Sequence, residues 1–161
     1  MLDIRNDLIV PLDSIDTDQM LEFWRWLIPH THQPLFATAL GDLFLIDTDG
    51  LVLWLDMAFG DLQTIADNQA VFRQSLADPE NDSRWFGSVL VDTLRASSRV
   101  LGPGECYSYR RLWLLGGRNE PDNFVIRDVL KHFRIWGQIH EQIEDYLDFP
   151  ELWAERFEVL E

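Results

Sequence analysis

Four histidines and one cysteine are the side chains of this sequence best suited to metal binding or nucleophilic chemistry. His30 and His32 lie two residues apart between prolines, but a catalytic zinc ion needs a third protein ligand. His132 and His140 are eight residues apart and fall near one side of an expected helix. No further side chain completes either pair at a recognisable metal-ligand spacing. We therefore predict no metal site and interpret all four histidines as surface residues.

Cys106 is the only cysteine, so the chain forms no internal disulfide, which fits a reducing compartment. A catalytic thiolate needs a neighbouring base and an electropositive setting. Glu105 stands directly before this residue, and an adjacent carboxylate opposes a lowered thiol pKa. We interpret Cys106 as a half-buried structural thiol.

The turns rich in glycine and aspartate carry neither a phosphate motif nor a calcium motif. Gly116 and Gly117 precede an arginine, but the spacing of a phosphate-binding loop is missing. The turn that begins at Asp47 starts like a calcium loop, which also needs Gly at its sixth position and Glu at its twelfth. Val52 and Ala58 stand there instead. The sequence predicts no catalytic residue, no metal and no cofactor, and we expect the protein not to be an enzyme.

The elements that would position these side chains follow from turn chemistry and hydrophobic spacing. The 161-residue length and the 47% hydrophobic content predict one domain over residues 1–161. The Asp-Gly turn at 47–50 and the short apolar runs around it indicate an antiparallel β-meander. Helical patterns come before and after this meander rather than alternating with it. The predicted fold class is α+β: an antiparallel β-meander sheet packed with several α-helices.

The expected boundaries are as follows. Strands are expected at 36–40, 43–46, 51–56, 62–66, 107–115 and 123–127, and a loop is expected at 78–82. Helices are expected at 19–28 behind a cap at Asp16 or Thr17, up to 76 behind a cap at Asp67 or Asn68, at 82–99, at 129–146, and as a short helix from Pro150.

The net charge is −15, from 13 basic and 28 acidic residues. The segment 84–134 is mildly basic, whereas 1–22 and 141–161 are strongly acidic. Nucleic acid and anionic membranes are poor direct partners for such a chain, because both require a basic surface. A basic protein is a good partner, because opposite fields speed the encounter. No stretch approaches about 18 consecutive apolar residues, so we predict no membrane span.

Two ordered segments resemble a known family. The first comprises 41–46, 49–56, 60–62 and 65–66, and the second comprises 104–107, 114–117, Asn123 and 136–140. This order and spacing resembles the C-terminal domain of immunity proteins that neutralise type VI secretion DNase effectors. The resemblance covers about 36–145, with 1–35 as an N-terminal helical extension. That extension is too short for the separate upstream domain that such proteins often carry.

The resemblance implies an antitoxin that binds a cognate effector, expected to be a nuclease, and occludes its active site. It implies no enzymatic role, and it makes Trp54 a fold determinant rather than a contact residue. Since the acidic N-terminus lacks a signal peptide, we expect the protein to act in the cytoplasm. A nuclease needs a basic surface to hold DNA, so an acidic inhibitor could occupy that surface as a DNA mimic.

The expected partner contacts are acids and aromatics near the two acidic ends. They are Glu141, Glu144, Asp145, Asp148, Glu151, Trp153 and Trp26. Two alternatives remain open at this point. One is an acidic protein–protein adaptor without toxin specificity, and the other is a small-ligand site beside Gly116 and Gly117.

Overall fold

The computed structural model describes the backbone of residues 4–148 and the side chains of residues 4–145. The helices and strands follow the chain as η1 (Asn6–Leu8), β1 (Ile9–Val10), α1 (Thr17–Leu21), η2 (Glu22–Trp24), β2 (Gln33–Thr38), β3 (Leu43–Ile46), β4 (Val52–Asp56), β5 (Asp61–Ala66), α2 (Gln69–Ser75), α3 (Pro79–Asn81), η3 (Asp82–Phe86), α4 (Ser88–Ala96), β6 (Glu105–Tyr109), η4 (Trp113–Leu115), η5 (Pro121–Asn123), β7 (Phe124–Asp128) and α5 (Val129–Asp148). The η elements are 3-10 helices, except η3, which is a π-helical turn.

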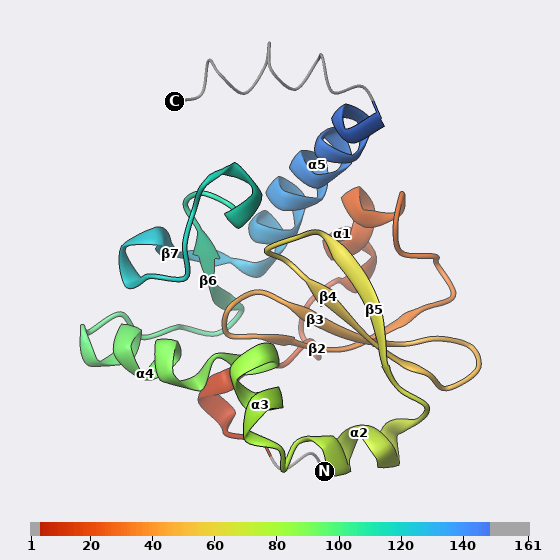
Figure 1. Cartoon of the computed structure of the whole chain (residues 1–161), viewed down its shortest axis with the longest axis horizontal. Helices are drawn as coiled ribbons and strands as arrows, with labels where there is room; N and C mark the ends of the chain where they lie inside the picture. Colours follow the sequence, from red (N-terminus) through yellow and green to blue (C-terminus); the bar gives the residue numbers. More distant parts are fainter. Residues whose placement is uncertain (1–3, 149–161) are drawn as a thin grey trace.

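Strands β1 to β5 form an antiparallel sheet in the order of the chain (Figure 1). Phe44 of β3 pairs with Trp54 of β4. The turn between these strands is closed by Asp47, whose Oδ1 accepts the backbone N–H groups of Asp49 and Leu51, each at 2.9 Å. The predicted α+β class and the β-meander are confirmed, and the short edge strand β1 is an addition that the sequence did not predict.

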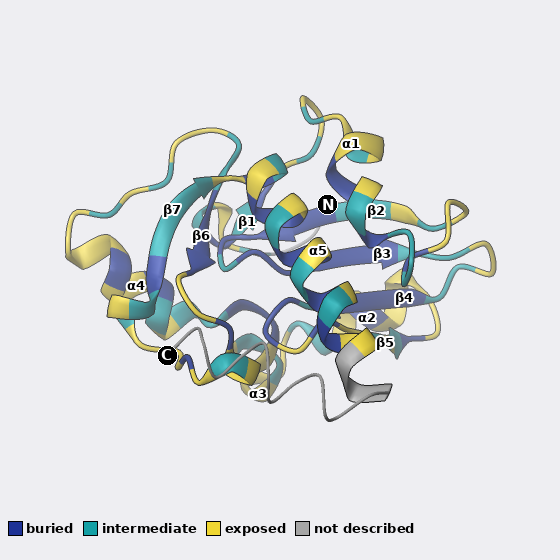
Figure 2. Cartoon of the chain, turned by 90° about the horizontal axis from the view of Figure 1, so that it is seen from above, coloured by how far each residue is buried: buried dark blue, intermediate teal, exposed yellow. Residues whose placement is uncertain are grey.

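Helices cover both faces of this sheet. In Figure 1, α1 and α5 lie on one side of it, and α2, α3 and α4 lie toward the other. Figure 2 shows the dark blue, buried strands of the sheet beneath α5. Among the residues that the structure describes, no helix combines the length and apolar character needed to cross a bilayer.

The second sheet contains β6 and β7, which pair antiparallel from Glu105 opposite Asp128 to Tyr109 opposite Phe124. The backbone N–H of Tyr107 donates to the carbonyl of Ala39 at 2.7 Å, which joins β6 to the end of β2. Helix α5 follows β7 directly and packs across both sheets. The two sheets therefore share one core rather than forming separate domains.

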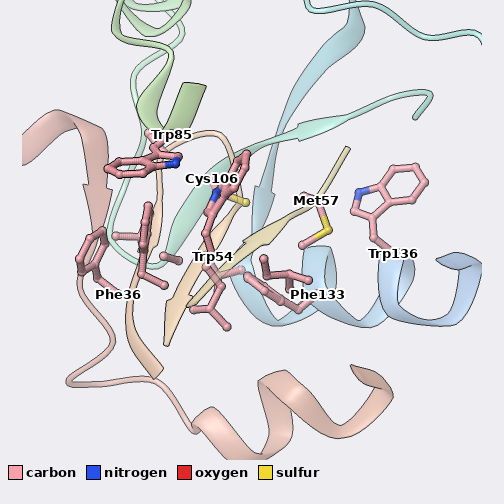
Figure 3. Close-up of a cluster of buried hydrophobic side chains, with 14 of the residues drawn as sticks. Phe36, Trp54, Met57, Trp85, Cys106, Phe133 and Trp136 are labelled. Carbon is pink, nitrogen blue, oxygen red and sulfur yellow. The ribbon is translucent and has the colours of Figure 1, made fainter. Parts of the chain in front are cut away.

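Aromatic side chains fill that core. Figure 3 shows the buried cluster running from Phe36 and Trp85 to Phe133 and Trp136 on α5. The rings of Phe36 and Phe44 stack with their centroids 5.0 Å apart. Aromatic pairs at such distances stabilise a core by about 0.5–1.5 kcal/mol beyond the area that they bury.

The first predicted helix is shorter than expected. Asp16 caps it as predicted, since its Oδ1 accepts the N–H of Gln19 at 3.1 Å. The α-helix ends at Leu21, and the chain tightens into η2. This tightening places the Trp24 indole N–H 2.8 Å from the carbonyl of Phe133, so a tertiary hydrogen bond overrides the helical periodicity.

The expected loop at 78–82 is wrong, and so is the expected start of the following helix. Asp78 caps a helical turn by accepting the N–H of Glu80 at 2.9 Å, and Pro79 provides a preset first helical residue. The turn continues as η3 and stops at Gly87, which has the left-handed conformation at φ 55°. Helix α4 begins only after this break, so the glycine separates two helical pieces that the sequence pattern had merged.

The predicted strand 107–115 is also wrong beyond Tyr109. Leu112 turns into the core, and its carbonyl accepts the N–H groups of Leu115 and Gly117, both at 2.9 Å. Gly117 packs so closely that a Cβ there would lie 1.9 Å from the carbonyl oxygen of Arg111. The chain therefore folds back on itself where an apolar run had suggested a strand. The short helix expected from Pro150 lies outside the described residues.

The surface prediction is wrong for His132 and His140, which are both buried. His132 lies between Ser108, whose Oγ is 2.6 Å from Nδ1, and Gly41, whose carbonyl is 2.9 Å from Nε2. His140 Nε2 is 2.7 Å from the carbonyl of Met57. Each ring satisfies a backbone carbonyl that the turns of the sheet present to α5, which explains why a polar residue stands on the inner side of this helix. His30 is exposed and His32 is half-buried.

Candidate functional site

A cleft of about 680 Å³ opens beside the end of the five-stranded sheet. The β2–β3 turn and the ends of β4 and β5 form one wall, and η3 with the start of α4 forms the other. Tyr109 of β6 and residues of the loop after η4 complete the lining. The cleft thus joins four parts of the chain that are distant in sequence.

Two carboxylates belong to this lining, Asp42 and Asp56. Asp42 is buried in the β2–β3 turn, where it accepts the N–H of Met57 at 2.9 Å and the indole N–H of Trp54 at 3.2 Å. Asp56 ends β4, is half-buried, and accepts the N–H of Ala58 at 3.1 Å. Asp42 is therefore held by the fold on both oxygens, whereas Asp56 is the more accessible of the two.

Both carboxylates are shifted toward the neutral form. Burial raises the pKa of Asp42 well above its usual range, and the nearby charge of Asp56 adds to the shift. Burial also raises the pKa of Asp56 to about 6, and Asp61 adds to it, whereas Arg84 opposes it. A negative charge on either carboxylate is therefore only partly compensated by the surroundings of the cleft.

Arg84 is the only cationic side chain among the described residues that line the cleft. Its guanidinium carbon lies 5.2 Å from the centroid of the Trp54 ring, and one of its nitrogens donates to the Oε1 of Gln63 at 2.6 Å. The indole of Trp85 is also part of the lining, and its Nε1 has no hydrogen-bond partner within the described chain. The walls are thus aromatic and polar rather than purely apolar.

Large exposed apolar side chains line the cleft or lie next to its lining, since Phe59 and Val89 belong to the lining and Trp113 lies beside Phe59. Phe59 is 44% exposed, Val89 is 77% exposed, and Trp113 is 41% exposed. The ring centroids of Phe59 and Trp113 lie 6.3 Å apart, and the guanidinium carbon of Arg118 lies 4.6 Å from the centroid of the Trp113 ring. Clustered exposed apolar residues with a polar surround mark interaction surfaces in soluble domains. We refer to Phe59, Val89 and Trp113 as the rim.

The predicted contact residues are only partly described. Glu141, Glu144 and Asp145 are exposed on α5 as a partner surface requires, but the structure does not test their role. The side chain of Asp148, and Glu151 and Trp153, lie outside the described residues. Trp26 is half-buried, stacks on Trp24 at 5.8 Å, and donates its indole N–H to the carbonyl of Gly137 at 3.2 Å.

The acidic part of α5 lies next to the loop that carries Phe59 of the rim. His140 contacts the carbonyl of Met57, two residues before Phe59, and Glu141 follows His140 directly. The structure thus brings the predicted acids of α5 near one side of the cleft. Sequence reasoning missed Asp42, Asp56 and the aromatic walls, because Asp42 falls between two expected strands and Trp54 was interpreted as a fold determinant.

Two other features singled out from the sequence lie outside the lining of the cleft. Gly116 and Gly117 do not line the cleft, and the second is packed against the backbone of Arg111. Cys106 is fully buried rather than half-buried, and burial raises the pKa of its thiol, which leaves it unreactive. Within the described residues, no three His, Cys, Asp or Glu side chains come together as a metal site.

A comparison with protein families shows which family part of the chain resembles. Residues 66–140 match the family described as T6SS immunity protein Tdi1, C-terminal. This stretch, which is slightly less than half of the chain, is similar to the immunity family. No curated protein matched the chain.

The immunity family is one of non-enzymatic inhibitors, in agreement with the prediction that the protein is not an enzyme. The matched segment lies within the 36–145 range of the resemblance and contains η3, α4, the second sheet and the start of α5. It therefore includes one wall of the cleft. The other wall, with Asp42 and Asp56, precedes the match in sequence.

Proposed function

We propose that this protein neutralises a type VI secretion effector by direct binding, and that the effector is a nuclease. The match of residues 66–140 to an immunity family is the observation that carries this proposal. The role requires a stable binding surface and no chemistry, which suits a fold that buries His132, His140 and Cys106 in its interior.

The charge of the chain supports a nuclease target. The net charge is −15, and a nuclease must present basic surface to the phosphates of its substrate. An acidic inhibitor gains both encounter rate and affinity from such a surface. We propose that the protein occludes the active site by covering this basic surface, with the exposed acids of α5 among the contacts.

Coexpression with the product of the adjacent effector gene tests the role. Cells that carry the effector should survive only when this protein is present, and the two proteins should copurify as a complex. Binding without protection would instead favour the adaptor alternative, and protection without any complex would contradict direct inhibition.

Competition with DNA tests the occlusion mechanism. A DNA duplex should compete with this protein for a catalytically inactive variant of the effector, and raising the salt concentration should weaken the complex. Simultaneous binding of DNA and this protein, or a complex unaffected by salt, would contradict DNA mimicry.

A further inference from the structure

We propose that the cleft is the docking recess for a basic side chain, lysine or arginine, carried on a loop of the effector. This inference rests on the proposed function and names the part of the effector that the fold recognises. The loop would place its charged head beside Asp56 and its flanking residues on the rim. Neither carboxylate of the cleft was predicted as a contact from the sequence.

Charge complementarity identifies the occupant. Two carboxylates, Asp42 and Asp56, face one guanidinium, Arg84, among the described lining residues. Once Asp56 is ionised, its charge lies in a partly desolvated setting, and the guanidinium of Arg84 is engaged by the Trp54 ring and by Gln63. Buried charges in proteins are normally paired. One incoming cation completes the balance, whereas an anionic or neutral head group does not.

The walls add partners for the segment that carries the cation. Arg84 already occupies the face of the Trp54 ring at 5.2 Å, so the incoming cation would pair with Asp56 rather than stack on this indole. The Trp85 Nε1 in the same lining lacks an acceptor, and a carbonyl of the entering loop is the kind of group that it lacks. The cleft therefore offers partners to both the side chain and the backbone of a peptide segment.

The volume and the rim favour a loop over a free small cation. A cleft of about 680 Å³ lies in the middle of the range of about 300–1,000 Å³ that ligand pockets occupy. A single side chain fills only part of that space. Phe59, Val89 and Trp113 expose apolar surface at the mouth, where the residues on either side of an inserted side chain would pack. A buried anchor within an apolar and polar surround is the usual arrangement of an interface hot spot.

Binding of a cation beside Asp56 has a consequence for protons. The charged or titratable groups that act on this carboxyl are Asp42 from the β2–β3 turn, Asp61 from β5, Arg84 from η3 and Tyr109 from β6. In the free protein, burial holds the pKa of Asp56 at about 6. A docked cation favours the ionised carboxylate, so complex formation near pH 6 should release protons. The affinity should accordingly rise as the pH increases from 5.5 to 7.5.

Titration calorimetry with the catalytically inactive effector tests the inference. Asp56→Asn should weaken the complex by at least about tenfold, the loss typical of removing one partner of a buried interfacial charge pair. Asp67→Asn, a change of the same kind at an exposed carboxylate outside the cleft lining, should bind as the wild type does. Titrations in two buffers of different ionisation enthalpy should show proton release at pH 6 for the wild type and less for Asp56→Asn.

The outcomes separate the two proposals. If the wild type binds the effector and Asp56→Asn binds equally well, the cleft is not the docking recess, and the immunity role still stands. If the wild type does not bind the effector at all, the proposed function fails, and the docking inference fails with it. The thermal unfolding temperature of Asp56→Asn shows whether weaker binding comes from a loss of folded protein. We expect this variant to be at least as stable as the wild type, so that weaker binding would report on the cleft itself.

Discussion

The ionised carboxylate of Asp56 lowers the stability of the free protein, yet it is the group that we propose to bind a cation of the partner. Its half-buried position at the end of β4 raises its pKa to about 6, so the free protein holds a charge that its surroundings disfavour. No sequence pattern marks this residue, because acids are common at strand ends. The nearest available signal was Asp42, an acid between Gly41 and the apolar run of β3. Its burial could be recognised only after the turn was known to face Trp54 and Met57.

Asp56→Asn should stabilise the free protein at high pH. The folded-state pKa is raised, so the native state binds the proton more tightly than the unfolded chain, and its stability falls as the pH rises from about 4 to about 6. Asparagine removes this penalty, and we expect a gain of about 1–2 kcal/mol in the free energy of unfolding at pH 8 and none at pH 4. Urea unfolding at the two pH values measures the difference. A loss of stability at pH 8 would show that the carboxylate is a structural requirement of the turn.

His132→Ala should destabilise the fold strongly at neutral pH. The ring bridges Ser108 and the carbonyl of Gly41 inside the core, so its removal leaves a cavity and an unpaired carbonyl, at a cost of about 3 kcal/mol. Burial lowers the pKa of His132 to about 4, so the wild type itself loses stability as the pH falls from about 6.5 toward 4. The difference in the free energy of unfolding between the wild type and His132→Ala should therefore be smaller at pH 4.5 than at pH 7.

Urea unfolding at pH 7 and pH 4.5 measures this effect. His30→Ala is the matched control, because His30 is exposed, and its stability should stay within about 0.5 kcal/mol of the wild type. If His132→Ala and His30→Ala unfold alike at pH 7, the buried bridge contributes nothing to the fold.

At the scale of elements, the sequence predicted those parts of the fold that local chemistry specifies. Strands β3 and β4 and the turn between them follow from alternating apolar runs around an Asp-Gly pair, and α5 follows from its long apolar stripe. The predictions were wrong where a tertiary contact determines the conformation of the backbone. Leu112 ends β6 early because it turns into the core, and Gly87 separates η3 from α4. The cleft lies between the predicted meander and these two segments, so periodicity alone could not predict it.

The contact between α5 and the η2 segment should be sensitive to a single methyl group. A Cβ at Gly137 would lie 2.7 Å from the carbonyl oxygen of Phe23 and 2.9 Å from Nε1 of Trp24. Gly137→Ala should therefore destabilise the protein by about 1–3 kcal/mol through overpacking, although alanine favours a helix interior by about 1 kcal/mol over glycine.

Thermal and urea unfolding check this prediction, with Gln138→Ala as the control at the exposed neighbouring position. The control should be neutral within about 0.5 kcal/mol. A more stable Gly137→Ala variant would mean that α5 can move away from η2 at little cost, and that the Trp24–Phe133 hydrogen bond does not fix its position.

For the molecule as a whole, the two acidic regions and the cleft should affect different steps of complex formation. Exposed charges steer the encounter of two proteins and act on the association rate, whereas a buried charge pair holds the formed complex and acts on the dissociation rate. The exposed acids of α5 lie beside the loop that carries Phe59. An effector drawn to α5 would therefore arrive next to the rim of the cleft.

Replacing Glu141, Glu144 and Asp145 together by lysine should slow association with the effector by about tenfold at low salt, with little change in the dissociation rate. Asp56→Asn should show the opposite pattern, with faster dissociation.

The control replaces three exposed acids on other surfaces, Asp49, Asp67 and Glu80, by lysine, which changes the net charge by the same amount. Surface plasmon resonance at several salt concentrations resolves both rates. If the control triple slows association as much as the α5 triple, the net charge alone steers the effector, and α5 has no special place in the encounter. If only the α5 triple does so, the acidic end of the chain guides the effector toward the cleft, and the two surfaces act in sequence.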